Sequence, residues 1–442
     1  MTSELSNFAA RLREAILSEG RVPRDPNSEL RTPNSERQNQ NGDSWNAPLR
    51  DFDELALELF ALQLKHNPAY RKICAGRKLM PGAVEHWTEI PVVPTAVFKG
   101  LELTCIPPVE RTTVFHSSGT TEQKPSRHFH NAESLAVYEA SLWSWFERHG
   151  VPDFGVRSSE FETLILTPPP AQAPHSSLVH MFETIRRKLG APETAFVGKL
   201  AADGLWALDL ASATDWLSPR RQTPDARPCL LLGTAFSFVH LLDHLVETNL
   251  RFQLPAGSRV METGGYKNRS RTMPKSELHA LIMERLDVPL EYTICEYGMS
   301  ELGSQAYNGT IQVNDRPHPG PLPPERENCR QSSGESVAFG NSKERTLPFP
   351  LPEGEVQGEG KRAVKTRGFR FPPWVRAQII SPETGREAAE GETGLIRLFD
   401  LANVFSVMAI QTEDLGIRRG EHFELIGRAA LAEARGCSLM TI

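Results

Sequence analysis

The sequence predicts an α/β fold, with a large domain in which helices flank mixed or parallel sheets. From residue 88 onward, short apolar segments typical of buried strands alternate with segments of helical period. This alternation predicts a mainly parallel sheet. The chain has 442 residues, of which 39% are hydrophobic, and this is enough to bury a sizeable core. The net charge of −6 argues against nucleic-acid binding as the main role.

The chain begins with a helix, a polar linker and a second helix. Apolar residues recur at helical spacing near the N-terminus, namely Leu5, Phe8, Leu12 and Ile16. Residues 21–48 are rich in Arg, Pro, Asn, Ser and Gln, which predicts a disordered linker. The run DFDELALELFALQLKH (51–66) predicts an amphipathic helix. We therefore assign 1–50 to an N-terminal helix and linker and 51–427 to the main domain.

Strands and helices are then expected in alternation. The predicted strands are 112–115, 162–167, 228–233, 258–265, 393–401 and 423–428. The predicted helices are 179–189, 236–248 and 273–286, the last with a serine (Ser276) in a position to cap its N-terminus. Residues 316–370 have many Pro, Gly, Glu and Ser and little periodicity, which predicts a long flexible insertion.

The absence of an apparent targeting signal and the spacing of the cysteines predict a cytoplasmic protein. No run of 18 apolar residues occurs, so no membrane span is expected, and the N-terminus lacks the apolar core of a signal peptide. The six cysteines form no CxxC pair and no zinc spacing. Free thiols in a reducing compartment fit this pattern.

A small polar loop, HSSGTTEQKPS (116–126), directly follows the strand TTVF. Its hydroxyls and unhindered backbone N–H groups suit a triphosphate, to which a lysine adds a positive charge. The candidate phosphate-binding residues are Ser117, Ser118, Gly119, Thr120, Thr121 and Lys124. The alternative interpretation is a Ser/Thr/Gly turn that binds nothing.

Two further motifs carry acidic residues. In YGMSE, the carboxylate of Glu301 is a candidate Mg²⁺ ligand and Tyr297 is suited to stacking on a purine. In TEDLG, Asp414 would follow a strand and accept the hydroxyls of a ribose. The alternatives are a glycine turn with a solvated Glu301 and a plain hairpin turn at Asp414.

The order of these motifs along the chain resembles the adenylate-forming superfamily of acyl-CoA ligases, luciferases and peptide-synthetase adenylation domains. The resemblance implies that Thr120 and Thr121 contact phosphates, that Glu301 ligates Mg²⁺ and that Asp414 binds ribose. It places Arg428 at a hinge and implies ATP and Mg²⁺ as the cofactors. The remaining nucleotide-binding residues that it implies are Gly264, Gly265, Tyr266, Tyr297, Gly298 and Met299.

A closer resemblance is to the acyl-protein synthetase (LuxE) family, which serves bacterial fatty-acid reductase complexes. The segments that carry it are VPTAVFKG (93–100), FHSSGTT (115–121), SSLVHM (176–181), GGYK (264–267), YGMSE (297–301), FPPWVR (371–376), TEDLG (412–416) and GRAALAEARGCSL (427–439). The resemblance implies a long-chain-fatty-acid–protein ligase with a fatty-acid substrate and an acyl-reductase partner.

The segment after the hinge, residues 428–442, resembles a truncated C-terminal domain that is reduced to a short tail carrying Cys437. In the larger relatives, the loop after the hinge enters the active site for the second half-reaction. The resemblance therefore implies that Cys437 is the acyl acceptor. The adjacent Arg435 suits this role because a nearby cation lowers a thiol pKa. The alternative is an idle terminal thiol.

Two other functions stay open. The first is an adenylate-forming enzyme that hands its acyl or aryl group to coenzyme A. The second is a non-catalytic subunit that binds nucleotide or a reductase as a scaffold, with 316–370 as its docking segment. The phosphate loop of the family commonly has Gly after its second Thr, where this sequence has Glu122, and this difference motivates the second alternative.

Overall fold

In the computed structural model, the described residues are 3–19, 52–77, 82–117, 124–151, 161–202, 205–218, 226–264, 273–308 and 368–429. The chain divides into a main unit, Met1–Ile311 with Arg367–Ile442, and a second unit, Gln312–Thr366. All described residues belong to the main unit. The predicted linker at 21–48, most of the predicted insertion at 316–370 and residues 430–442 lie outside the described residues.

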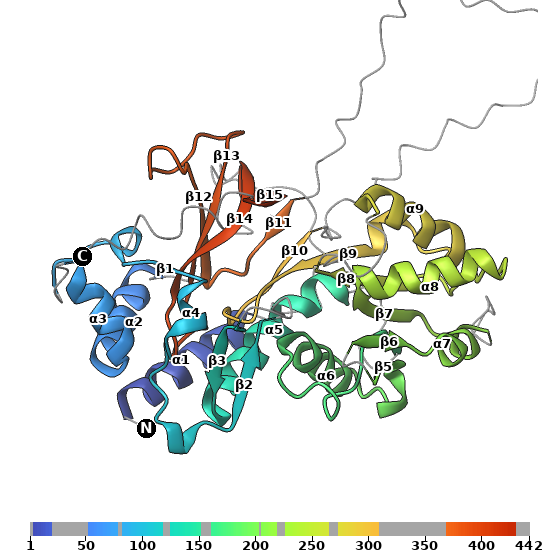
Figure 1. Ribbon diagram of the computed structural model, residues 1–442, viewed down its shortest axis with the longest axis horizontal. Helices are drawn as coiled ribbons and strands as arrows, with labels where there is room; N and C mark the ends of the chain where they lie inside the picture. The colour runs from blue at the N-terminus through green and yellow to red at the C-terminus, as the bar shows by residue number, and fades with distance from the viewer. Residues whose placement is uncertain are drawn as a thin grey trace, which may run out of the picture. The chain divides into compact units, whose positions relative to one another are not determined.

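The helices and strands alternate along much of the chain (Figure 1). The helices are α1 (Ser3–Glu19), α2 (Phe52–His66), α3 (Pro68–Gly76), α4 (Val97–Gly100), α5 (Ala132–Gly150), α6 (Ser177–Leu189), α7 (Leu210–Leu217), α8 (Ala235–Glu247) and α9 (Lys275–Leu286). The strands are β1 (Val93–Pro94), β2 (Thr113–His116), β3 (Arg127–His130), β4 (Glu162–Ile165), β5 (Gly198–Leu200), β6 (Trp206–Leu208), β7 (Cys229–Thr234), β8 (Arg259–Thr263), β9 (Thr293–Tyr297), β10 (Ala306–Asn308), β11 (Phe369–Arg370), β12 (Val375–Ile380), β13 (Thr393–Asp400), β14 (Ala409–Arg419) and β15 (His422–Arg428).

The main sheet is mixed, which confirms the predicted class of mixed or parallel sheets, whereas the narrower expectation of a mainly parallel sheet is wrong. Its strand order is β12-β13-β14-β15-β11-β10-β9-β8-β7-β4, and β1 pairs with β14. The pairs β4/β7, β7/β8, β8/β9 and β1/β14 are parallel, and the rest are antiparallel. The helices α8 and α9 supply the crossovers that parallel neighbours need, whereas short connections join β12 to β15 and permit antiparallel pairing.

The parallel part of the sheet is buried on both faces. Along β7, Leu230 and Leu232 belong to one hydrophobic core, and Leu231 belongs to another that includes residues of α7, α8 and α9. Side chains alternate between the two faces of a strand, which explains this division. The continuous apolar run at 228–233 is therefore the signature of a strand covered on both sides.

The predicted elements are confirmed, with changes at their ends. The helix α6 begins at Ser177, before the predicted 179, because the side chain of Ser176 caps it by accepting a hydrogen bond from the backbone N–H of Val179. Ser276 lies inside α9 and does not cap it, since the N-cap residue is Pro274 and makes no side-chain bond. The strand β11 lies within the predicted insertion, so the main sheet resumes before residue 371.

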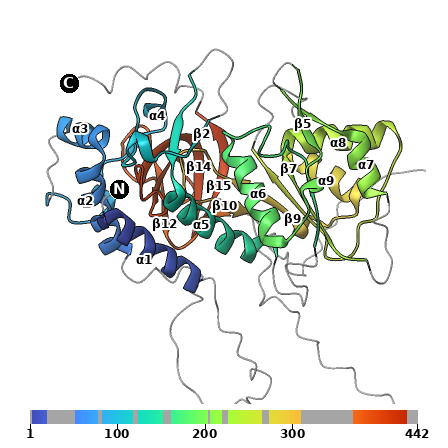
Figure 2. The same cartoon turned by 90° about the horizontal axis from the view of Figure 1, so that it is seen from below.

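The N-terminal helix α1 packs on α5 and α2 (Figure 2). The four apolar residues predicted to form its buried face, Leu5, Phe8, Leu12 and Ile16, are all buried. They belong to the larger of the two cores. No helix in the described part of the chain has the length and hydropathy that crossing a bilayer requires.

Substitutions in α1 test whether this helix contributes to the core. Ile16 is fully buried, whereas its neighbour Leu17 is 38% exposed. We expect Ile16→Ala to lower the free energy of unfolding by about 2–5 kcal/mol, because it removes buried methyl groups and leaves a cavity. Leu17→Ala is the matched control and should change it by less than about 0.5 kcal/mol. Urea unfolding followed by circular dichroism measures both, and equal effects would contradict the packing of α1.

Candidate active site

The strands on either side of the predicted phosphate loop form a hairpin of their own. The strand β2 pairs antiparallel with β3, ending at the pair His116 and Arg127. Just beyond, the backbone N–H of Ser117 donates to the carbonyl of Ser126 at 3.3 Å, and the N–H of Ser126 donates to the Ser117 hydroxyl at 3.0 Å. These bonds close the neck of the loop. Lys124 is exposed, and the predicted residues Ser118, Gly119, Thr120 and Thr121 lie outside the described residues.

Glu301 is buried and lies against the neck of this loop. The hydroxyl of Ser126 donates to Oε1 of Glu301 at 2.6 Å, and the hydroxyl of Ser300 donates to Oε2 at 3.0 Å. Asn403 Nδ2 donates to the Glu301 carbonyl at 2.8 Å. Nδ1 of His128 lies 2.7 Å from the carbonyl oxygen of Ser300 and acts as the donor, since a carbonyl only accepts. The structure therefore brings the predicted metal ligand to the predicted phosphate loop.

The site suits Mg²⁺ held jointly with a nucleotide. The oxygens here belong to the carboxylate of Glu301 and the hydroxyls of Ser126 and Ser300, and such hard oxygen donors are the ligands that Mg²⁺ prefers. Within the described ranges, no three His, Cys, Asp or Glu side chains come close enough together to hold a metal ion. A single carboxylate matches the usual way in which Mg²⁺ is bound, through one or two carboxylates and the phosphates of a substrate.

Tyr297, Asp414 and Arg428 come together at the other end of the YGMSE segment. The hydroxyl of Tyr297 donates to Oδ2 of Asp414 at 2.9 Å, and Arg428 Nε lies 3.6 Å from Oδ1. Asp414 is a register partner of Arg428 on the neighbouring strand. Burial raises the pKa of Asp414, while the hydrogen bond from Tyr297 opposes that shift. The expectation that Asp414 follows a strand is wrong, because it lies inside β14.

Two glycines of the predicted nucleotide site, Gly264 and Gly298, stand where a side chain would not fit or would be strained. A Cβ atom at Gly298 would lie 2.3 Å from Oε1 of Glu296. Gly264 has φ +72°, the left-handed region that favours glycine. It follows β8 directly, next to the end of β9, so the carboxyl ends of two parallel strands meet here. Open α/β sheets commonly bind ligands at such an edge.

The remaining predicted nucleotide residues have different outcomes. Met299 is half-buried against the larger core, and its carbonyl accepts the N–H of Leu302 at 3.1 Å. Gly265 and Tyr266 lie outside the described residues. The prediction that Tyr297 stacks on a purine stays a prediction, and its ring packs edge-on against Phe369 and Phe371.

Sequence reasoning missed several buried polar residues at this site. Ser126 stands at the end of the quoted loop motif but received no role. Glu296 interrupts an otherwise apolar strand, which was an available signal. It is buried, accepts a hydrogen bond from the Thr263 hydroxyl, and its pKa is raised by burial to about 7. Asp400 had no such signal, because it stands at a strand end where acidic residues are ordinary.

The cysteines in the described part of the chain fit a packing role. Those cysteines, Cys74, Cys105, Cys229 and Cys295, are buried and none of the four is in a disulfide bond. Burial raises the pKa of Cys74 to about 11 and of Cys105 to about 12. Lys275 Nζ donates to the sulfur of Cys295 at 2.6 Å, yet burial still raises the pKa of that thiol. Cys437 lies outside the described residues.

His116 stacks on His175, with ring centroids 4.7 Å apart. Burial lowers the pKa of His116, and the neighbouring His175 and Arg127 add to that effect. The surroundings therefore favour the neutral form of this imidazole at the start of the phosphate loop.

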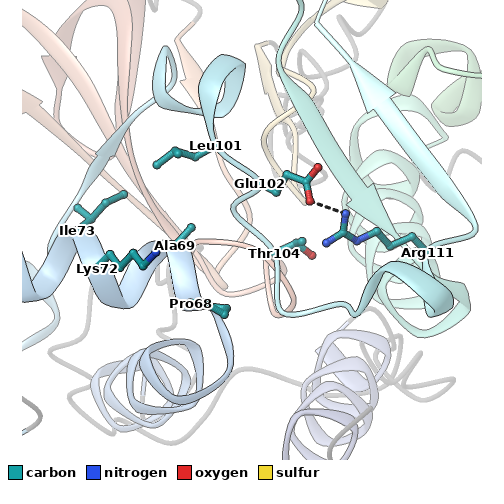
Figure 3. Close-up of a pocket in the computed structure, with 8 residues that line it drawn as sticks. All are labelled: Pro68, Ala69, Lys72, Ile73, Leu101, Glu102, Thr104 and Arg111. Carbon is teal, nitrogen blue, oxygen red and sulfur yellow. Dashed lines mark hydrogen bonds and ion pairs between the residues drawn. The ribbon is translucent and has the colours of Figure 1, made fainter.

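A hollow of about 500 Å³ lies between α3 and the chain that follows α4 (Figure 3). It is lined by Pro68, Ala69, Lys72, Ile73, Leu101, Glu102, Thr104 and Arg111, none of which is a predicted site residue. Figure 3 shows Glu102 and Arg111 pointing toward one another, and their ion pair is 2.7 Å long. Glu102 also forms an ion pair with Arg127 of β3 at 3.2 Å, so a residue that lines this hollow also contacts the hairpin that carries the phosphate loop.

The pH dependence of stability tests the buried carboxyl of Glu296. Because its pKa is raised from 4.5 to about 7 in the fold, its stabilising contribution is complete below pH 4.5 and is lost as the pH rises through 7. Between pH 4.5 and 7, we expect the free energy of unfolding to fall less for Glu296→Gln than for the wild type. The two decreases should differ by up to about 3 kcal/mol. Urea unfolding at several pH values measures this difference. The exposed Glu383→Gln is the control, and parallel curves for Glu296→Gln and wild type would contradict the assignment.

Comparisons with known proteins identify one relative in sequence and several in fold. No family model matches the sequence. The chain is 22% identical over 419 residues to the long-chain-fatty-acid–luciferin-component ligase of Aliivibrio fischeri, which covers 88% of this chain and 86% of that protein.

Solved structures show the same fold. The structure of 2-hydroxyisobutyryl-CoA ligase in an open conformation, in complex with 2-HIB-AMP and CoA, is 13% identical with a TM-score of 0.54, over 86% of this chain and 71% of that chain. The same ligase in its thioesterification state has a TM-score of 0.55, over 87% and 69% of the two chains. The predicted α/β fold and the stated resemblance are thereby confirmed. This chain has the fold of the adenylate-forming acyl-CoA ligases and is similar, along most of its length, to a ligase of long-chain fatty acids.

Proposed function

We propose that this protein activates a carboxylic acid, a fatty acid by its similarity to the ligase from Aliivibrio fischeri, as an acyl-adenylate and then transfers the acyl group to its own Cys437. The observation that carries the proposal is the arrangement around residues 297–301. One end of this segment holds Glu301 against the neck of the phosphate loop, and the other holds Tyr297 on Asp414. A nucleotide lying along the segment would meet a phosphate site and a ribose site.

In the first step, a carboxylate oxygen attacks the α-phosphorus of ATP, an acyl–phosphate bond forms, and the bond to pyrophosphate breaks. Charge accumulates on the phosphate oxygens in this step, so positive charge and N–H donors must face them. Glu301 would hold Mg²⁺, which supplies part of that positive charge. The loop from Ser117 to Lys124 would supply hydroxyl and N–H donors and an ammonium group.

Asp414 would orient the nucleotide through its ribose. An ionised carboxylate has about four lone-pair sites, of which Tyr297 occupies one in the free protein. Two ribose hydroxyls are therefore compatible with the bond from Tyr297. Arg428, beside the same carboxylate and 74% exposed, is free to follow a bound nucleotide or the tail beyond it.

In the second step, the thiolate of Cys437 attacks the carbonyl carbon of the mixed anhydride. A carbon–sulfur bond forms, the bond to the phosphate oxygen breaks, and AMP leaves, so that the enzyme carries a thioester. An acyl reductase would then take the group from Cys437. Burial raises the pKa of Cys74, Cys105 and Cys295, which supports an acceptor outside the described core.

A second candidate acceptor is coenzyme A. The structural relative was solved in complex with 2-HIB-AMP and CoA, and this chain shares its fold. In that case the first step is unchanged, and the acyl group passes to the CoA thiol without a covalent enzyme intermediate.

Pyrophosphate exchange tests the nucleotide site. We expect Glu301→Gln and Asp414→Asn each to lower acid-dependent ATP–pyrophosphate exchange by on the order of a hundredfold, because each removes a group that contacts the nucleotide or its metal. A panel of carboxylic acids of increasing chain length identifies the substrate in the same assay. Glu383→Gln, an exposed carboxylate between β12 and β13, is the matched control and should leave the rate unchanged. Full-rate exchange in both site variants would exclude this site.

Covalent labelling tests the acceptor. With ATP, Mg²⁺ and a labelled fatty acid, we expect a hydroxylamine-labile label on the wild type and on Cys105→Ala but not on Cys437→Ser. Exchange should stay within about twofold in Cys437→Ser, because the thiol acts only in the second step. An equal labile label on Cys437→Ser would rule out this cysteine. Acyl transfer to added CoA without self-labelling would instead support the second candidate.

A further inference from the structure

Ser126 joins the phosphate-loop hairpin to the segment that carries Glu301. It is 1% exposed and makes three hydrogen bonds, two through its backbone and one through its hydroxyl. Its backbone N–H and carbonyl bond to Ser117 on the opposite side of the neck, at 3.0 and 3.3 Å. Its hydroxyl donates to Oε1 of Glu301 at 2.6 Å, although the two residues are 175 positions apart in the chain.

The hydroxyl of Ser126 supplies a hydrogen-bond donor to the buried carboxylate of Glu301. A carboxylate removed from water needs hydrogen-bond donors. Two side-chain hydroxyls, those of Ser300 and Ser126, donate to Glu301 within the described residues. Ser300 precedes Glu301 in the chain and moves with it, so its bond does not fix the carboxylate relative to the loop. Among the described residues, only the hydroxyl of Ser126, which comes from a distant part of the chain, does so.

The hairpin that carries Ser126 is itself held in place. On one side of Ser126, His128 Nδ1 donates to the carbonyl of Ser300 at 2.7 Å. The intervening Arg127 forms an ion pair with Glu102 at 3.2 Å, and Arg111 holds the other oxygen of Glu102 at 2.7 Å. The position of the Ser126 hydroxyl is therefore set by contacts that do not involve Glu301.

We propose that Ser126 is a positioning residue that fixes the carboxylate of Glu301 at the neck of the phosphate loop and thereby sets the Mg²⁺ requirement for ATP binding. This inference rests on the proposed function for the identity of the ligand. Ser126 acts through Glu301, since it holds the carboxylate in place before the metal and the nucleotide arrive. Binding then avoids the cost of ordering that side chain.

Binding of ATP in the absence of any acid tests the proposal without requiring catalysis. Equilibrium dialysis of labelled ATP over a Mg²⁺ series gives the Mg²⁺ concentration for half-maximal binding. We expect Ser126→Ala to raise that concentration about tenfold, as is typical when a hydrogen bond to a charged group is lost. Ser126→Thr, which keeps the hydroxyl, should restore most of the affinity. Ser144→Ala, which truncates a buried serine of α5, is the control and should change nothing.

A double-mutant cycle separates positioning from a general effect on folding. In a Glu301→Gln background, where the charged acceptor is gone, Ser126→Ala should raise the Mg²⁺ requirement by less than about twofold. An unchanged requirement in Ser126→Ala, or the same tenfold effect in both backgrounds, would overturn the proposal. If Ser126→Ala does not fold, Ser126→Cys carries the same test, because its thiol is a weak donor of similar size.

Failure of this inference is distinguishable from failure of the proposed function. Suppose that ATP binding depends on Mg²⁺ and on the Ser126 hydroxyl, but that none of the acids supports pyrophosphate exchange. This result upholds the role of Ser126 and refutes the proposed ligase activity. Suppose instead that an acid supports exchange and that the Mg²⁺ requirement is the same in wild type and Ser126→Ala. This result upholds the ligase activity and refutes the role of Ser126. A wild type that binds no ATP at any Mg²⁺ concentration overturns both.

Discussion

The buried carboxylate of Asp400 ties the two halves of the main sheet together at the site. It stands at the end of β13 in the antiparallel half and accepts hydrogen bonds from the chain that follows β9 in the parallel half. Gly303 N–H donates to it at 2.9 Å, and the hydroxyl of Ser304 donates at 2.8 Å. Ala402 N–H donates from its own side at 3.0 Å. Burial raises the pKa of Asp400 to about 6, against the effect of these donors.

This tie determines where the YGMSE segment can lie. Gly303 approaches the backbone of Ala402 so closely that a Cβ atom there would lie 2.8 Å from the Ala402 carbonyl carbon. Asn403, three residues after Asp400, donates to the carbonyl of Glu301. The chain after β9 is thus fixed at Glu301 and again two residues later, which leaves Glu301 facing the loop hairpin and Tyr297 facing β14. The proposed phosphate and ribose sites depend on this one anchored segment.

Each face of the β8/β9 pair carries one buried glutamate, Glu262 or Glu296, and the two have different neighbours and opposite pKa shifts. Glu262 and Cys295 are register partners, and Lys275 and His279 each lie 3.4 Å from the Glu262 carboxylate. On the next pair, Glu296 has the hydroxyl of Thr263 and no cation beside it in the described residues. Burial would raise the pKa of both acids, but at Glu262 the hydrogen bonds from His279 and Cys295 and the charge of Lys275 more than offset it. One face therefore holds an ion cluster and the other a carboxyl that is partly neutral near pH 7.

Local patterns predicted the parallel half of the fold well and the antiparallel half less well. The apolar runs of β7 and β8 identify strands because both faces are buried, and the helical period of α8 and α9 fixes the crossovers between them. Asp414 was misplaced because Asp and Gly favour turns, whereas here the register shifts between Leu415 and Gly416 as in a bulge. A strand that contains a bulge keeps its pairing while losing the alternating pattern from which strands are recognised.

The contacts that assemble the site have the largest sequence separations, and this explains which of its residues escaped prediction. A motif identifies residues that lie near one another in the chain, such as Ser117 and Lys124, or a short run such as YGMSE. The partner of Ser126 lies 175 positions away, and that of Tyr297 lies 117 positions away. Nothing near Ser126 in the chain requires a hydroxyl there; the requirement comes from a carboxylate that folding buries beside it. Chemical groups of the site are thus readable from local sequence, whereas the residues that position them become apparent only when burial creates their need for a partner.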